Sequence, residues 1–188
     1  PGPNDVNGAG GGGHSGNDVD LGGIASGSLF DVVLVEFDFT PTQTPLTFRY
    51  AFASEEYCEY VNTMFNDVFG FFISGPGIAG TQNLATVPLT NFPVTINTIN
   101  HVTNPALYIH NTPPGLNNCE TGGVSGTLPP VPPATGPAVN ELQYDGFTRE
   151  MIALAQVIPC STYHIKLAIG DVGDGNWDAA VFLRANSF

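Results

Sequence analysis

The feature that most constrains this chain is an alternation of apolar and polar residues that recurs in short segments. In residues 46–52, LTFRYAF, large apolar side chains occupy every second position, which is the period of a half-buried strand. Residues 29–39 and 162–169 have the same period, residues 68–73 form a short apolar run closed by a turn, and residues 179–185, AAVFLRA, are predicted to be the final strand. This pattern predicts an all-β protein, an antiparallel β-sandwich of jelly-roll-like form.

The strand predicted at residues 29–39 has one wholly apolar face. Val33, Val35, Phe37 and Phe39 share that face, and we expect all four to meet the core. The strand that begins at residue 46 is expected to run antiparallel to it.

Strands are also predicted at residues 141–147 and 148–157, although the second segment has some helical spacing. Residues 110–140 are rich in proline and glycine and are expected to form a long loop. Residues 1–17 are of low complexity and glycine-rich, which indicates a flexible arm. We therefore expect one sandwich domain over residues 18–188.

The charge balance excludes several classes of partner. Seventeen acidic residues face four basic ones, for a net charge of −13. Nucleic acid and anionic membrane surfaces both need lysine and arginine, so neither is an expected partner. Apolar runs are too short for membrane insertion. The balance suits a secreted protein in a medium that contains calcium, because cations offset single-sign surface charge.

Two oxygen-rich loops are the candidate metal-binding segments. Residues 170–178, GDVGDGNWD, carry Asp171, Asp174 and Asp178 between glycines that let the backbone curl. Three converging carboxylates repel one another unless they are solvated or share a cation. The spacing is not that of an EF-hand. We predict that these three aspartates bind Ca²⁺, and a solvated acidic hairpin is the alternative.

The second loop joins the strands at residues 46–52 and 68–73 and contributes Glu55, Glu56 and Asp67, which we expect to help bind the ion. The alternative is a solvated crossover loop. Trp177, beside the aspartates, is a candidate ligand platform, although packing is its more ordinary role.

The chain offers no complete catalytic constellation. Glu55 and Glu56 are adjacent, Ser54 lacks a nucleophile elbow, and the histidines lack zinc-protease spacing. We do not expect an enzyme.

The three cysteines, Cys58, Cys119 and Cys160, contain no C-x-x-C pair, so a zinc site is not expected. We predict one disulfide, Cys119–Cys160 in preference to Cys58–Cys160. That bond would tether the long loop and leave Cys58 free or intermolecular.

Several motifs resemble one known family. FRYAFASEEY, FNDVFGFFISGPG, PVTINTIN, LQYDGFT and TYHIKLAIGDVGDGNWDAAVFLRANSF are similar, in this order, to the choice-of-anchor L domain of bacterial (Bacteroidetes-type) exported surface proteins. The resemblance covers about residues 17–188. It implies secretion to the cell surface and places the family's characteristic acidic residues on the six carboxylates named above.

The resemblance also implies a mode of assembly. Family domains normally carry further strands before the glycine-rich segment, which implies an open edge near residues 29–39. Another copy or another surface polypeptide would complete this edge in trans. The expected function is an extracellular, calcium-stabilised structural or adhesive module of a bacterial surface protein or fibre. The alternatives are a lectin-like carbohydrate-binding module, whose partners would be glycans, and a hydrolase.

Overall fold

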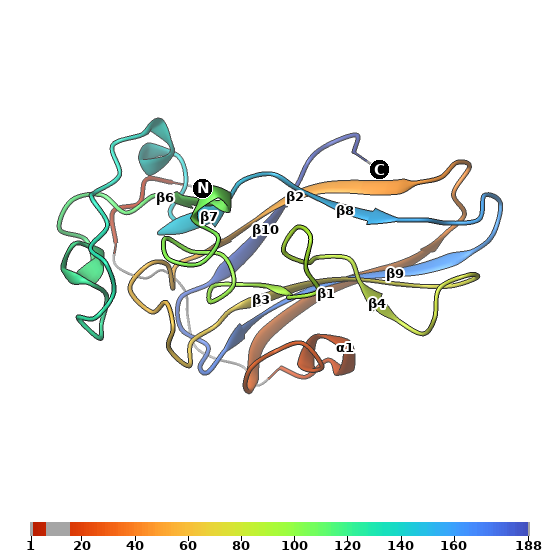
Figure 1. Ribbon diagram of the computed structural model, residues 1–188, viewed down its shortest axis with the longest axis horizontal. Helices are drawn as coiled ribbons and strands as arrows, with labels where there is room; N and C mark the ends of the chain where they lie inside the picture. Colours follow the sequence, from red (N-terminus) through yellow and green to blue (C-terminus); the bar gives the residue numbers. More distant parts are fainter. Residues whose placement is uncertain (1, 7–15, 188) are drawn as a thin grey trace.

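The computed structural model describes residues 2–6 and 16–187 and consists of two antiparallel sheets packed face to face (Figure 1). Each sheet has five strands. The predicted all-β sandwich is therefore confirmed. Within the described residues the helices are short: α1 (Val19–Gly22), η1 (Pro105–Leu107), η2 (Asn118–Thr121) and η3 (Pro137–Asn140).

The first sheet has the order β1-β9-β3-β4, and β5 also pairs with β3. These strands are β1 (Leu29–Phe39), β3 (Val68–Ser74), β4 (Gln82–Asn83), β5 (Val94–Thr95) and β9 (Tyr163–Val172). The second sheet has the order β10-β2-β7-β6, and β8 also pairs with β2. Its strands are β2 (Leu46–Ser54), β6 (Tyr108–His110), β7 (Gly146–Thr148), β8 (Met151–Ala155) and β10 (Ala179–Leu183).

Aromatic side chains from the two sheets interlock to form the core. Phe48 of β2 meets Phe71 of β3 edge to face, with ring centroids 4.4 Å apart, and Tyr50 packs on Phe69 at 5.2 Å. All four are buried, as the alternation in their strands predicts. Such aromatic pairs contribute about 0.5–1.5 kcal/mol beyond the burial of their area, so they hold the two sheets in register.

One face of β1 departs from the prediction. Phe37 and Phe39 pack against the core, but the side chains of Val33 and Val35 are 63% and 59% exposed. The expectation that all four meet the core is thus wrong for the two valines. The reason is that β1 is an edge strand, paired with β9 on one side. Alternation specifies a shared face but not whether another strand covers it.

Between the long loop and β8 the strand boundaries also differ from those predicted. Residues 141–145 form turns rather than strand, and pairing begins at Gly146. Within residues 148–157 the strand interpretation is confirmed, because β8 pairs with β2 and buries every second side chain. The packed face of a sheet therefore decides the ambiguity between helix and strand.

The predicted glycine-rich arm is partly described. Residues 7–15 lie outside the described part of the chain. Asn4, however, is 3% exposed, and its amide nitrogen donates to Asp145 Oδ1 at 2.8 Å and to the Asn111 carbonyl at 3.0 Å. This portion of the arm is docked against the second sheet rather than free.

Candidate functional site

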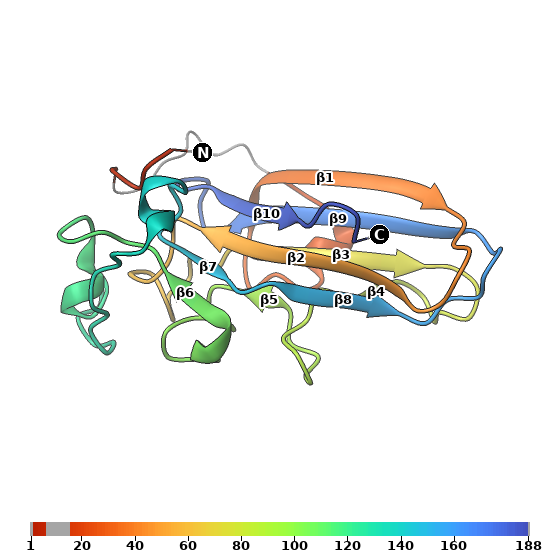
Figure 2. The same cartoon turned by 90° about the horizontal axis from the view of Figure 1, so that it is seen from above.

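Four strand ends meet at one end of the sandwich. β2 ends and β3 begins there, and β9 ends and β10 begins there (Figure 2). The Glu55 N–H donates to the Asp178 carbonyl at 3.2 Å, and the Asn66 N–H donates to the Val172 carbonyl at 3.3 Å. The two acidic loops, far apart in sequence, are therefore joined by backbone hydrogen bonds.

This contact gathers the six predicted carboxylates into what we call the acidic cluster: Glu55, Glu56, Asp67, Asp171, Asp174 and Asp178. Glu55, Glu56, Asp67 and Asp171 are between 0% and 4% exposed. Asp174 is half-buried, and Asp178 is exposed. Burial of four carboxylates argues against the alternative of two solvated loops.

Asp67 lies at the base of the acidic cluster. Its Oδ2 accepts a hydrogen bond from Ser54 Oγ at 2.8 Å, and its Oδ1 accepts one from the Val172 N–H at 3.3 Å. The Glu56 N–H donates to the same Ser54 Oγ at 2.9 Å. Glu56 Oε2, in contrast, is buried and has no hydrogen-bond partner among the described residues.

Burial is the main reason that the carboxyl pKa values in the acidic cluster are raised. It raises the pKa of Glu56 to about 10, with further repulsion from Asp67, Asp174 and Asp171. Burial and neighbouring carboxylates raise the pKa of Asp171 to about 8. The pKa of Asp67 rises to about 7 even though its two hydrogen bonds lower it. Without a cation, the site therefore holds protons near neutral pH.

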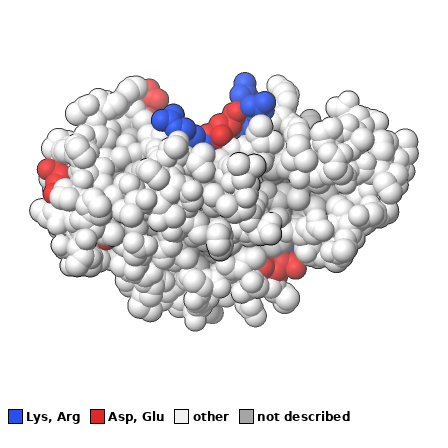
Figure 3. Space-filling model, in the orientation of Figure 1, with Lys and Arg blue, Asp and Glu red and all other residues white. Residues whose placement is uncertain are grey.

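Basic side chains do not neutralise the acidic cluster. Of the four in the chain, Lys166 pairs with Asp18 at 2.7 Å and with Asp20. Arg49 and Arg184 both pair with Glu150, and Arg149 Nε donates to the Ala106 carbonyl. The face shown in Figure 3 carries few charged side chains.

The donor set fits a hard divalent cation, because Ca²⁺ binds oxygen ligands and favours carboxylates. Among the described residues, the group of three ligand atoms within 4.8 Å of one another is Cys58, His110 and Cys119 rather than any carboxylate trio. The first and last of these are disulfide-bonded, so they offer no thiolate to a metal. Binding of an ion at the acidic cluster would require its carboxylates to draw closer together.

Asp31 is a contributor that the sequence analysis missed. It lies in β1 at an irregularity in the pairing with β9, with a φ of 45°. Its charge raises the pKa values of both Asp171 and Asp178. The sequence signal that could have identified Asp31 is its position as a charged residue within the otherwise apolar first half of that strand.

Trp177 packs on Tyr60, with ring centroids 4.5 Å apart, and remains half-buried. The contact supports a packing role for the indole beside the acidic cluster. Its role as a ligand platform stays a prediction.

The predicted disulfide is wrong. Cys119 is bonded to Cys58, with Cα atoms 5.6 Å apart, and Cys160 is exposed and free. The Cys160 N–H donates to the Pro41 carbonyl in the β1–β2 turn, at the far end of the sandwich from Cys58. The bond still anchors the long loop, as expected of Cys119, but it anchors it to the loop after β2.

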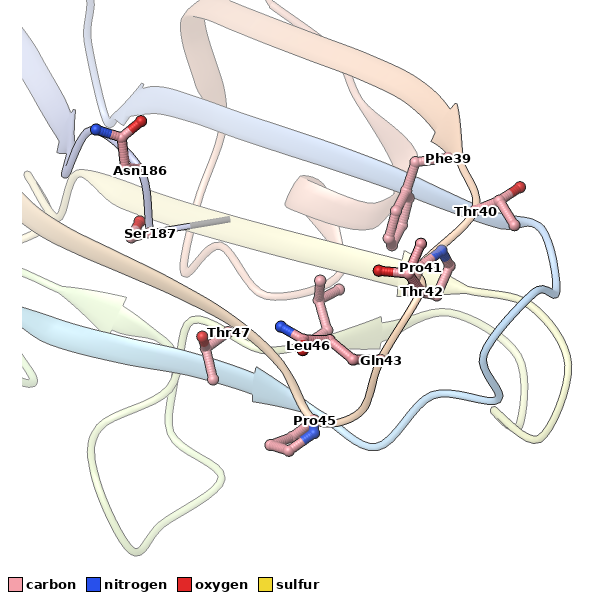
Figure 4. A pocket seen from close by; sticks show the side chains of 10 residues that line it. All are labelled: Phe39, Thr40, Pro41, Thr42, Gln43, Pro45, Leu46, Thr47, Asn186 and Ser187. Carbon is pink, nitrogen blue, oxygen red and sulfur yellow. The ribbon is translucent and has the colours of Figure 1, made fainter.

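A pocket of about 470 Å³ lies at that far end (Figure 4). Its lining includes Phe39, Thr42, Gln43 and Asn186, and no described residue of the lining carries a charged side chain. The length of β2 separates it from the acidic cluster, a distance of roughly 25–30 Å. Among the described residues, this pocket therefore has no titratable group for acid–base chemistry.

The sequence model of the choice-of-anchor L domain matches residues 1–188. The chain belongs to the choice-of-anchor L family. No curated protein and no solved structure matches it. The family is one of cell-surface or exported proteins and is not an enzyme family. Among the described residues, no helix of this choice-of-anchor L domain has the length and apolar character needed to cross a membrane.

Proposed function

We propose that this choice-of-anchor L domain is a calcium-stabilised structural or adhesive module of a bacterial cell-surface protein or fibre. Family membership supports the surface location. The single observation that carries the calcium proposal is the buried, unpartnered Oε2 of Glu56 among carboxylates that no basic side chain neutralises.

A bound Ca²⁺ would relieve the electrostatic cost of this end of the fold. Buried carboxylates that repel one another favour protonation, and a divalent cation reverses that preference by interacting with the ionised forms. Because the acidic cluster joins the loops at the ends of four strands, an ion there would hold both sheets together. Such a clamp suits a module that bears load outside the cell.

The test is thermal unfolding of the chain in excess calcium and in excess chelator. We expect a melting temperature several degrees higher with calcium, since an ion that binds only the native state stabilises it by mass action. Magnesium at the same concentration is the control for ionic strength. Identical melting curves in calcium and chelator would refute the proposal.

A lectin-like module is the second candidate. Its supporting observation is the half-buried Trp177 next to the acidic cluster, because aromatic faces are common sugar platforms. A glycan array in the presence of calcium tests it. Glycan binding by the wild type that is lost in Trp177→Ala would favour the lectin hypothesis over a purely structural role.

A further inference from the structure

The two sheets are offset by one strand. β10 is the edge of the second sheet and contacts β9, the neighbour of β1 in the first sheet. Figure 2 shows β10 along β9 and β2 along β3, whereas no described strand of the second sheet runs over β1. Counting only the described strands, the second sheet is therefore one strand short beside β10.

An apolar groove of about 220 Å³ occupies this position. Val33, Val35 and Phe37 of β1 form one wall, and Val181 and Leu183 of β10 form another. No charged residue is found in the lining within the part of the chain that the structure describes. Val33, Val35 and Leu183 are 63%, 59% and 51% exposed, so large apolar side chains face water along one line. Soluble proteins rarely leave an apolar edge of this kind uncovered.

We propose that this groove and the free edge of β10 bind an extended segment of a partner polypeptide, which pairs with β10 as the next strand of the second sheet. Neighbouring strands lie about 4.8 Å apart and facing sheets about 10 Å apart. A strand added beside β10 would therefore lie opposite β1 and cover its valines. The inference names a partner for the surface module proposed above and rests on that proposal.

The groove defines the chemistry of the segment. Because β10 has five residues, the paired stretch spans about five residues, of which every second side chain points into the groove. Those inward side chains are apolar, since an inward charge would be desolvated without a partner. The flanking residues are neutral or basic, because the chain itself has a net charge of −13.

A second copy fits this position less well. Two chains with a net charge of −13 each repel one another. In a dimer whose two β10 strands pair about a two-fold axis, β10 of the second copy would lie opposite β1 of the first copy. β9 of the second copy packs against its own β10. It would then occupy the place that β1 of the first copy already fills. The same offset between the two sheets that leaves space beside β10 therefore prevents this symmetric dimer.

The experiment uses the 188-residue chain in excess calcium and a capped peptide of about seven residues, in which valine alternates with threonine between terminal lysines. Binding is measured by calorimetry, and its place by amide hydrogen exchange over residues 179–183. We expect slower exchange there when the peptide is bound. A peptide with a central proline, which cannot donate to the ladder, should not bind.

Val33→Asp should weaken peptide binding at least about tenfold, because it buries a charge against the added strand. Ile152→Asp is the matched control. Ile152 is also an exposed apolar residue at 52%, but it lies on β8, away from the groove. Val35→Asp repeats the test at a second position, and exchange protection in β3 verifies that each variant is folded.

Three outcomes would overturn the inference: no binding, binding without protection of residues 179–183, or equal weakening by Ile152→Asp. Light scattering adds a fourth, since a dimer that Val33→Asp dissociates would make a second copy the occupant. Because calcium is present throughout, these failures are distinguishable from an absent calcium response.

Discussion

Replacing Glu56 with glutamine is expected to remove the calcium response while leaving the metal-free chain about as stable as before. Burial and four neighbouring carboxylates, those of Asp67, Asp174, Asp171 and Glu59, raise the pKa of Glu56 to about 10. In the metal-free chain at pH 7 the side chain is therefore protonated and neutral, and glutamine has nearly the same size and no charge. Calcium binding, in contrast, needs the ionised carboxylate.

The magnitudes follow from that pKa. Ionising Glu56 at pH 7 in the metal-free chain costs roughly 4 kcal/mol, because each pKa unit corresponds to about 1.4 kcal/mol. Free calcium at 100 times its dissociation constant would stabilise the native state by about 2.7 kcal/mol. In a domain of this size that raises the melting temperature by about 5–10 °C. A hundredfold loss of affinity would reduce the stabilisation to about 0.4 kcal/mol.

The assay is calorimetric unfolding of wild type and Glu56→Gln, each in calcium and in chelator. Glu141→Gln is the matched control, because Glu141 is exposed and lies outside the acidic cluster. It should keep the full calcium shift. The reasoning is refuted if Glu56→Gln also keeps the full shift, or if it melts well below wild type in chelator.

Two further predictions concern pH and the disulfide. The metal-free chain should lose stability as pH rises from about 4 towards 8. The pKa values of Asp67 and Asp171 are raised to about 7 and about 8 in the folded state, so the folded chain binds more protons than the unfolded chain across this window. The check is thermal unfolding in chelator at several pH values. A stability that rises with pH over this window would contradict the prediction. Replacing Cys58 and Cys119 together with serine should lower the free energy of unfolding by about 4 kcal/mol in the chain-entropy model for a 61-residue separation. Cys160→Ser should leave this free energy nearly unchanged. Denaturant unfolding measures both effects, and non-reducing peptide mapping identifies the bonded pair.

Much of the candidate site could be predicted from the sequence. Asp171 and Asp174 stand out because a glycine separates them in an acidic segment between apolar runs, although Asp171 lies at the end of β9 rather than in the loop. Glu55 and Glu56 stand out because they follow a strong strand. Residue chemistry and strand spacing are sufficient to predict that both loops are candidate metal-binding segments. That the loops touch is a tertiary fact, seen in the hydrogen bond from the Glu55 N–H to the Asp178 carbonyl.

The disulfide and the pKa values could not be predicted from local patterns. Spacing along the chain does not reveal that Cys58 and Cys119 lie at the same end of the sandwich while Cys160 lies at the other. Raised pKa values depend on burial and on charges brought from β1, the loop after β2, the end of β9 and the loop after it. Both depend on contacts between segments that are distant in sequence.

The sequence by itself determined most of the long strands, which of their residues share a face, and the oxygen-rich segments, because alternation and turn chemistry act between near neighbours. Only the tertiary structure decided which strands lie at the edges. Val33 and Val35 of β1 are exposed, whereas Phe48 and Tyr50 of β2, which alternate in the same way, are buried. The difference arises because the second sheet ends at β10, and the width of a sheet is set by long-range strand pairing rather than by local periodicity.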